Sequence, residues 1–423
     1  MKSTRKGLVL FLLLLVSVFL LPNTGKAEEE EVRAVWVSFY EYEGAGLKNK
    51  PESTFRRNAD KMFKNIRDNG CNTVYFHVRA FDDAIWKSDN FEFSTYMGKE
   101  PDYDPLAILV ETAHKYQLSF HAWMNPYRIT QQKIYDPSKL STNSRILLAV
   151  REVIDGYAVD GIHFDDYFYP PKGHKQYSRY SSLSQKQKMS YVNQMIQSVY
   201  TTVKQKSPNL QFGISPAGNV ENCEAIGADI KTWMSVPGYV DYIVPQIYWS
   251  NAYVMNGKVT KLFDKRLSQW KKLNTANIPM YIGLGLYRGG MRDSSDIGWK
   301  RSSKVVASEI SKTRRSAKVS GYALYSYESL YKKSCRYEVK NLLTRISTVK
   351  IFGSQNTVAC GETLRLKAAV WPLRLGQSVT WKSSDSRIAT VSKKGIVKAK
   401  KKGKVTIYAV KGSRKTGVTI QVS

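Results

Sequence analysis

Residues that commonly hold metal ions are scarce in this sequence. It has 4 cysteines and 5 histidines among 423 residues. The cysteines form no CxxC pair, and the histidines show no HExxH pattern, although both patterns are typical of zinc sites. No Gly-rich phosphate loop follows residue 39, where a nucleotide-binding fold would place one. We therefore expect no metal site and no cofactor.

Long apolar runs are also absent, except near the N-terminus. A basic segment at residues 2–6 precedes the apolar run 8–21, and Gly25 and Ala27 follow it. This order is typical of a secretory signal peptide, which we expect to be cut after Ala27. An uncleaved anchor is the alternative, but about 14 apolar residues fall short of the roughly 20 that span a bilayer. The sequence therefore predicts a secreted, cell-wall-associated protein.

Acidic residues are few, above all near the C-terminus. The chain has 65 Lys and Arg against 35 Asp and Glu, a net charge of +30. Residues 346–423 hold 16 Lys and Arg against Glu362 and Asp385, which leaves +14 on this segment. On an exported protein, such charge favours an anionic cell-wall polymer or lipid surface over nucleic acid. A basic surface that serves only solubility is the alternative.

Short apolar runs alternate with amphipathic stretches from residue 32 onward. Eight apolar runs predict strands, at 32–39, 73–79, 118–125, 161–166, 210–215, 242–248, 279–286 and 321–327. Helical patterns lie between them, at 54–69, 105–116, 144–157, 185–206, 263–272 and 305–312. Eight β-then-α units with nearly continuous apolar strands predict a parallel sheet closed into a (β/α)8 TIM barrel. An open doubly wound sheet is the alternative.

The C-terminal segment has a different pattern. Short runs rich in β-branched residues are separated by Gly or Ser-Asp turns every 8–12 residues, which describes a small all-β sandwich of the immunoglobulin-like type. We expect a signal peptide at 1–27, the barrel at 28–345 and this module at 346–423.

Polar and aromatic side chains follow the predicted barrel strands where each strand ends. These residues are Arg79, Asp83, Asn125, Tyr127, Arg128, Asp165, Asp166, Gln246, Tyr248, Trp249 and Glu328. The carboxyl ends of barrel strands meet at one rim, where active sites lie. Strand alternation turns His163 and Asp165 into the barrel mouth and Ile162 and Phe164 toward the helices. The sequence therefore predicts a site at this rim.

Several segments carry a family resemblance. VRAVWVS, HVRAFDDAIW, NPYR and HFDDYFYP resemble the glycosyl-hydrolase-like family 10 proteins of bacterial envelopes, over residues 32–343. This resemblance implies a hydrolase barrel that acts on a polysaccharide, with peptidoglycan glycan strands the expected substrate. SVTWKSSD and IATVS, with the runs after them, are similar to the bacterial Ig-like group 2 module.

A more distant similarity concerns the fourth strand. The chitinase family 18 signature Asp-Gly-x-Asp-x-Asp-x-Glu matches Asp160, Gly161 and Asp165, but Tyr167 stands where the catalytic Glu would be. Asp166 is the nearest remaining candidate for the proton donor. The same tyrosine leaves open a second class of function, a non-catalytic protein that binds cell-wall carbohydrate.

Two carboxylates suffice for glycoside hydrolysis, and adjacent ones suit a division of roles. Asp165 and Asp166 are close enough for one charge to raise the pKa of the other, which can then serve as the acid. With an N-acetylhexosamine substrate, the acetamido oxygen could attack while the second Asp orients it. Glu328 as the second carboxylate is the alternative.

The remaining candidates are expected to bind substrate. Arg79 and Arg128 suit a substrate carboxylate, although Arg128 could instead sit in a structural ion pair. The predicted sugar platforms are Tyr127, Tyr167, Tyr248 and Trp249, the last of which could equally be a core residue. The predicted polar contacts are Asp83, Asn125, His163 and Gln246, although His163 could equally be a hydrogen-bonded histidine of the barrel interior.

Overall fold

A computed structural model of the 423-residue chain describes residues 31–343, 348–352, 356–371, 379–411 and 414–423. The predicted signal peptide at 1–27 lies outside the described residues. The predicted boundary between the two domains, at 345–346, also lies outside them.

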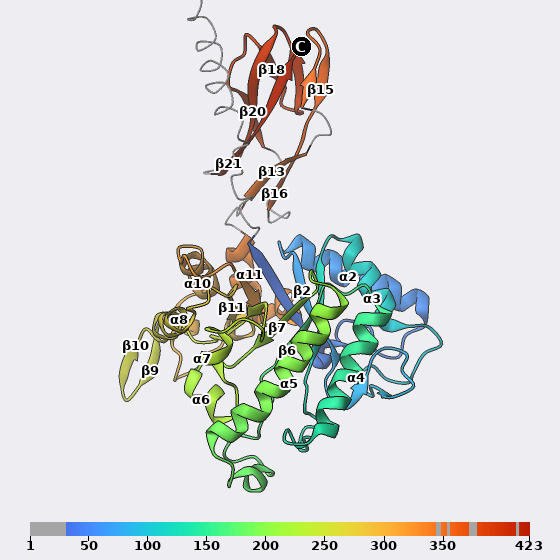
Figure 1. Ribbon diagram of the computed structural model, residues 1–423. Helices are drawn as coiled ribbons and strands as arrows, with labels where there is room; N and C mark the ends of the chain where they lie inside the picture. Colours follow the sequence, from blue (N-terminus) through green and yellow to red (C-terminus); the bar gives the residue numbers. More distant parts are fainter. Residues whose placement is uncertain (1–30, 344–347, 353–355, 372–378, 412–413) are drawn as a thin grey trace, which may run out of the picture. The chain divides into compact units, whose positions relative to one another are not determined.

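A sheet of eight parallel strands forms the centre of residues 32–343 (Figure 1). Its strands are β1 (Val32–Val37), β2 (Thr73–Arg79), β5 (Ser119–Met124), β6 (Gly161–Asp165), β7 (Gln211–Ser215), β8 (Tyr242–Ile243), β11 (Tyr281–Leu284) and β12 (Gly321–Leu324). They pair in the order β11-β12-β1-β2-β5-β6-β7-β8. Parallel bridges from Ile243 to Met280 and from Gln246 to Gly283 close the ring. The predicted (β/α)8 barrel is confirmed.

Helices surround the strands. The longer ones are α2 (Glu52–Asp68), α3 (Pro105–Lys115), α4 (Leu140–Gly156), α5 (Gln185–Lys206), α8 (Leu262–Leu273), α10 (Val305–Thr313) and α11 (Arg336–Leu343). Figure 1 shows them outside the strands, with α2 beside α3 and α4 beside α5. Local sequence sets several helix starts: the Asp104 side chain accepts from the Ala107 N–H, and Ser184 forms a capping box with Gln187.

Shorter elements decorate the barrel. They are β3 (Asp83–Ala84), β4 (Glu92–Phe93), β9 (Tyr253–Met255), β10 (Lys258–Thr260), α6 (Val220–Ala225), α7 (Ile230–Trp233), α9 (Gly298–Arg301) and the 3-10 turns η2 (Phe39–Glu41), η3 (Tyr177–Tyr180), η4 (Leu286–Arg288), η5 (Tyr327–Leu330) and η6 (Lys333–Cys335). The sixth barrel strand is shorter than predicted, because Pro245 carries no N–H to continue the ladder. Pairing resumes only as isolated bridges at Gln246.

Alternation along the strands divides the barrel into two apolar regions. Ile162 and Phe164 pack in the large core beneath the helices. Trp36, Tyr75 and Tyr242 instead form a cluster inside the barrel. His163 stacks on Tyr75 there, with ring centroids 4.0 Å apart, which confirms the predicted inward face of β6.

The C-terminal module is built only from strands within its described residues. They are β13 (Thr348–Phe352), β14 (Thr357–Val358), β15 (Thr363–Arg365), β16 (Lys367–Trp371), β17 (Thr380–Ser383), β18 (Ala389–Val391), β19 (Ile396–Ala399), β20 (Gly403–Lys411) and β21 (Arg414–Val422). β14-β21-β20-β17 and β15-β19-β18 form its two larger sheets. Alternate residues such as Val405, Ile407 and Ile420 fill the core between strands. The predicted small all-β domain is confirmed.

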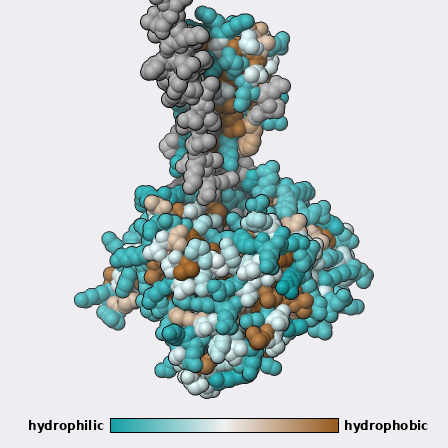
Figure 2. Space-filling view, viewed as in Figure 1, coloured by the Kyte–Doolittle hydropathy of each residue, from teal (hydrophilic) through white to brown (hydrophobic). Residues whose placement is uncertain are grey.

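The surface seen in Figure 2 is mostly hydrophilic, with apolar side chains in small scattered groups. The large apolar side chains are mostly inside, as hydrophobic burial requires. Within the part of the chain that the structure describes, no helix is long and apolar enough to cross a membrane.

Candidate active site

The two adjacent carboxyl groups lie where β6 ends at the barrel rim. Asp165 is buried and only 7% exposed, whereas Asp166 is half-buried. Asp165 Oδ1 accepts hydrogen bonds from the backbone N–H of Asp166 at 2.9 Å and from Gln246 Nε2 at 3.1 Å. The pair is thus held in a fixed geometry.

Burial makes the two carboxyl groups unequal. Burial raises the pKa of both groups. The pKa of Asp166 is raised well above its usual range, because the negative charge of Asp165 adds to burial. Hydrogen bonds from Asp166 and Gln246 and the nearby charge of Arg128 oppose the rise in the pKa of Asp165. Asp166 is therefore the member of the pair that keeps a proton more readily.

The loop after β8 supplies the residues beside this pair. Gln246 Nε2 also donates to the Ser215 carbonyl at 2.8 Å, which fixes its amide toward Asp165. Tyr248 is half-buried, and its ring stacks on Tyr325 with centroids 5.7 Å apart. Burial first, and then nearby Tyr325 and Asp165, raise the pKa of Tyr248. Gln246 thus contacts the carboxyl pair, and the substrate-binding roles of Gln246 and Tyr248 stay predictions.

Arg128 and Tyr167 form a second wall of the site. Tyr167 is 47% exposed, and the Arg128 guanidinium lies 4.3 Å from the centroid of its ring. The same guanidinium lies 5.0 Å from the centroid of Phe81. These two cation–π contacts hold a positive charge near Asp165.

Trp249 is a core residue, which is the alternative that the sequence left open for it. It is half-buried and packs against the main core. A Cβ added at Gly218 would come within 2.8 Å of the Trp249 ring, so the ring lies flush against the loop after β7. A sugar platform at Trp249 stays a prediction.

Three of the predicted binding residues lie beneath the surface, which corrects the substrate-binding role predicted for them. Arg79 is 1% exposed, and its guanidinium bonds to Asp82 at 2.7 Å and to the Asn125 carbonyl at 3.0 Å. Asn125 is fully buried and donates to the Ala80 carbonyl. Tyr127 is fully buried against Phe168. These side chains instead support the rim loops from below.

The substrate-binding role predicted for His163 is also corrected. His163 is the hydrogen-bonded histidine of the barrel interior that the sequence allowed as the alternative. It is fully buried, and both ring nitrogens have partners. Nδ1 lies 3.0 Å from Tyr242 Oη, and Nε2 lies 3.1 Å from Ser215 Oγ. Burial lowers the pKa of His163 well below its usual value, so the ring is neutral. It fills the barrel beneath Asp165.

Glu328 is paired with a lysine at the surface. Its side chain is 49% exposed, and its carboxylate lies 3.5 Å from Lys332 Nζ. Glu328 as the second catalytic carboxylate is therefore not supported by the structure. Its backbone N–H instead donates to a different carboxylate, Glu41, at 2.6 Å.

Sequence reasoning missed Glu41 and Tyr325. Glu41 is 6% exposed and accepts from the Ser38 N–H and the Ser326 hydroxyl. Burial raises the pKa of Glu41 to about 7, against the opposing effect of these hydrogen bonds. The Ser-x-x-Glu capping box at 38–41 was the available signal for Glu41. Strand alternation places Tyr325, two residues after Ala323, on the same inward face, and this was the available signal for Tyr325.

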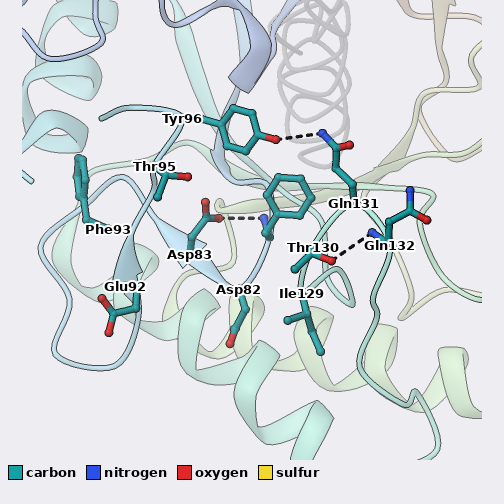
Figure 3. A pocket seen from close by; sticks show the side chains of 11 residues that line it. Asp82, Asp83, Glu92, Phe93, Thr95, Tyr96, Ile129, Thr130, Gln131 and Gln132 are labelled. Atoms are coloured by element: carbon teal, nitrogen blue, oxygen red, sulfur yellow. Dashed lines mark hydrogen bonds between the residues drawn. The ribbon is translucent and has the colours of Figure 1, made fainter. Parts of the chain in front are cut away.

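Asp83 lies apart from the carboxyl pair, in the wall of a cavity between the loops after β2 and β5 (Figure 3). Its Oδ1 accepts from the Phe81 N–H at 2.9 Å, and burial raises its pKa. Among residues 31–343 and the described parts of the module, no cluster of three or more His, Cys, Asp or Glu could hold a metal ion.

Two family models match the chain. The model described as Glycosyl hydrolase-like 10 matches residues 31–144 and 128–301, and the model described as Bacterial Ig-like domain (group 2) matches residues 346–422. Both resemblances predicted from the sequence are confirmed.

Similar proteins carry glycosyl hydrolase names. "Glycosyl hydrolase YngK" of Bacillus subtilis (strain 168) is 28% identical over 394 residues, which cover 78% of this chain and 76% of that one. "Glycosyl hydrolase DigH" of Escherichia coli (strain K12) is 25% identical over 397 residues, which cover 77% of this chain and 89% of that one. The PgaB (BpsB) glycoside hydrolase domain from Bordetella bronchiseptica shares the fold, with a TM-score of 0.52 at 10% identity over 74% of this chain and 99% of that one.

Proposed function

The chain belongs to the glycosyl hydrolase-like 10 family, and from this premise we propose that its barrel hydrolyses glycosidic bonds of a cell-wall polysaccharide. The proposed substrate is a glycan strand that contains N-acetylhexosamines, as in peptidoglycan. The observation that carries the proposal is the adjacent Asp165–Asp166 pair at the end of β6, held by hydrogen bonds to Asp165, in which burial raises the pKa of both groups and the charge of Asp165 raises that of Asp166 further.

Asp166 is the proposed general acid. Its raised pKa keeps a proton available near neutral pH, and this proton passes to the glycosidic oxygen as the bond to the sugar breaks. Positive charge then builds on the sugar ring, and the anionic Asp165 nearby stabilises it.

The substrate's own acetamido oxygen is the proposed nucleophile. With Glu328 turned toward Lys332, the described part of the rim supports Asp165 rather than a distant carboxylate as the partner of Asp166. Asp165 would accept a hydrogen bond from the acetamido N–H and so orient its oxygen toward the anomeric carbon. Water then opens the cyclic intermediate, with Asp166 in its anionic form as the base.

The residues around the pair have supporting roles in this mechanism. Gln246 fixes the rotamer of Asp165. The exposed Tyr167 ring and the half-buried Tyr248 ring suit the faces of sugars. Arg128 is the proposed partner of an acidic group on the substrate, such as the lactyl carboxylate of muramic acid.

The C-terminal module is the proposed anchor. All seven lysines between residues 393 and 404 are exposed, whereas Asp385, one of the two acidic residues of the module, is bound to Arg387 at 2.8 Å. This charge supports attraction to an anionic cell-wall polymer. The proposed location is accordingly outside the cell, attached to the wall.

A non-catalytic role in carbohydrate binding is the second candidate. The observation that favours it is Tyr167, which occupies the place of the chitinase glutamate. Digestion of purified glycan strands, with and without stem peptides, distinguishes the two roles. Hydrolysis predicts new reducing ends and shorter strands by mass spectrometry, whereas pure binding predicts strands of unchanged length.

A further inference from the structure

A cavity of about 450 Å³ lies beside the proposed active site and has no role in the mechanism above. Figure 3 shows segment 82–96 and segment 129–132 around it, with Gln131 bonded to Tyr96. Both segments follow strands of the barrel, β2 and β5, at their carboxyl ends. The volume lies within the roughly 300–1,000 Å³ that is usual for small-molecule sites.

Arg128 links the wall of the cavity to the residue that follows the carboxyl pair. Phe81 lines the cavity, and Tyr167 directly follows Asp166. The Arg128 guanidinium lies between these two rings, at 5.0 Å from the centroid of Phe81 and 4.3 Å from that of Tyr167. A polymer bound at Asp166 can therefore run across Tyr167 and Arg128 into the cavity.

The chemistry of the walls suits a sugar ring. Tyr96, whose ring stacks on Phe81 with centroids 5.6 Å apart, and Phe93 line the cavity and offer aromatic surface for the apolar face of a pyranose. Hydroxyl and amide groups of Thr95, Thr130 and Gln132 offer donors and acceptors for its hydroxyls. Gln131 Nε2 donates to Tyr96 Oη at 3.0 Å, which fixes the position of the Tyr96 ring.

The charge of the walls selects among sugars. Asp82, Asp83 and Glu92 line the cavity, and no Lys or Arg does. Asp82 is neutralised by Arg79 and Arg145, at 2.7 and 2.9 Å, so Asp83 and Glu92 set the local sign. Asp83 and Glu92 would repel a negatively charged sugar, and no lining residue is a Lys or Arg that could bind it.

We propose that this cavity is a distal subsite that binds a sugar unit without negative charge, on the same strand that is cleaved at Asp165 and Asp166. The inference rests on the proposed glycan substrate. Arg128, next to the carboxyl pair, is the proposed contact for an acidic sugar, whereas the cavity would reject one. A strand in which neutral and acidic sugars alternate would therefore bind in only one register.

Calorimetric binding to an Asp166→Asn background tests the subsite. The probes are N-acetylchitobiose, N-acetylchitohexaose and a carboxymethylated chitohexaose. Thr95→Trp fills the cavity from an exposed position, and Thr201→Trp, exposed on α5, is the matched control. Loss of one stacking surface and its hydrogen bonds predicts hexaose binding about tenfold weaker in Thr95→Trp, with biose binding unchanged. The charged hexaose should bind the background protein about tenfold more weakly than the neutral one.

The control should bind the hexaose as the background protein does. Equal hexaose affinity in Thr95→Trp and the background, or no hexaose binding at all, overturns the subsite. Equal affinity for the charged and neutral hexaoses overturns its selectivity. Cleavage by the wild-type protein is measured in a separate assay. If the hexaose binds in the cavity but is never cleaved, the proposed hydrolase function is refuted and the subsite stands.

Discussion

The backbone N–H of Asp166 donates a hydrogen bond to Asp165 Oδ1 at 2.9 Å, so the two adjacent carboxyl groups have different surroundings. Gln246 and the Asp166 backbone N–H both donate to Asp165 and hold the negative charge on that side. Retention of the proton by Asp166 gives the rim one acid and one anion within a single dipeptide, which is the division that glycoside hydrolysis requires.

The dependence of kcat/KM on pH should be bell-shaped. The proposed mechanism requires an ionised Asp165, so activity should be lost as the pH falls through the pKa of that group, which burial raises. The mechanism also requires a protonated Asp166, so activity should be lost as the pH rises through the pKa of that group, which is raised well above its usual value. These two values belong to the coupled pair.

Arg128→Gln should move the acid limb of that profile to higher pH. The positive charge of Arg128 lowers the pKa of Asp165, and its removal lets that pKa rise. Arg179→Gln, which removes an exposed arginine from η3, is the control and should leave the acid limb in place. An unmoved acid limb in Arg128→Gln would show that Arg128 does not act on Asp165.

Glu41 should make the barrel less stable as the pH rises from about 4.5 to about 7. The folded-state pKa of about 7 lies above the unfolded value, so the folded chain binds more protons across this window. The free energy of unfolding should fall by up to about 1.4 kcal/mol per pH unit from this group alone. Glu41→Gln should remove this part of the slope in denaturant titrations, whereas Glu43→Gln, whose side chain is 80% exposed, should retain it. An identical slope in both variants would argue against the raised pKa.

The lysines of the C-terminal module should govern attachment but not chemistry. Replacing Lys398, Lys400, Lys401 and Lys402 by Gln removes four exposed charges. Sedimentation with insoluble cell wall should fall and lose much of its salt dependence, since exposed charges are screened over about 8–10 Å at physiological ionic strength. Cleavage of short soluble glycans should stay the same.

Two further proteins complete that test. A second variant, in which Lys186, Lys265 and Lys300 are replaced by Gln, is the charge control. These three lysines are exposed on the barrel, and the variant should sediment as the wild type does. A chain that ends after Arg345 should behave like the module variant. If the truncated chain sediments with wall as well as the intact one at both low and physiological salt, the module is only a spacer.

Local pattern predicted the barrel and the position of its acidic pair. Apolar runs of strand length predicted the eight strands. The two-residue period of a strand predicted that Asp165 points inward and that Ile162 and Phe164 point outward. Only local geometry enters this argument, which is why a single sequence suffices for it.

Contacts between segments far apart in the sequence determine which of the candidate side chains are buried, and a single sequence does not show such contacts. Glu41 is buried because Ser326, 285 residues further along the chain, donates to it, while Glu328 is left in solvent beside Lys332. Tyr127 is covered by Phe168, from the next barrel unit. The capping box at 38–41 marks Glu41 as part of a helix start, but nothing in its own segment shows that Ser326 will cover it.

The most direct test of the account compares wild type, Asp165→Asn and Asp166→Asn on purified, peptide-free glycan strands, with products counted by mass spectrometry. Both substitutions preserve side-chain shape, so unchanged circular dichroism and thermal unfolding should accompany them. The account predicts that each variant cleaves at least about 100-fold more slowly than the wild type, the lower range for loss of general acid–base help. Wild-type rates in both variants would contradict it and place the chemistry away from this pair.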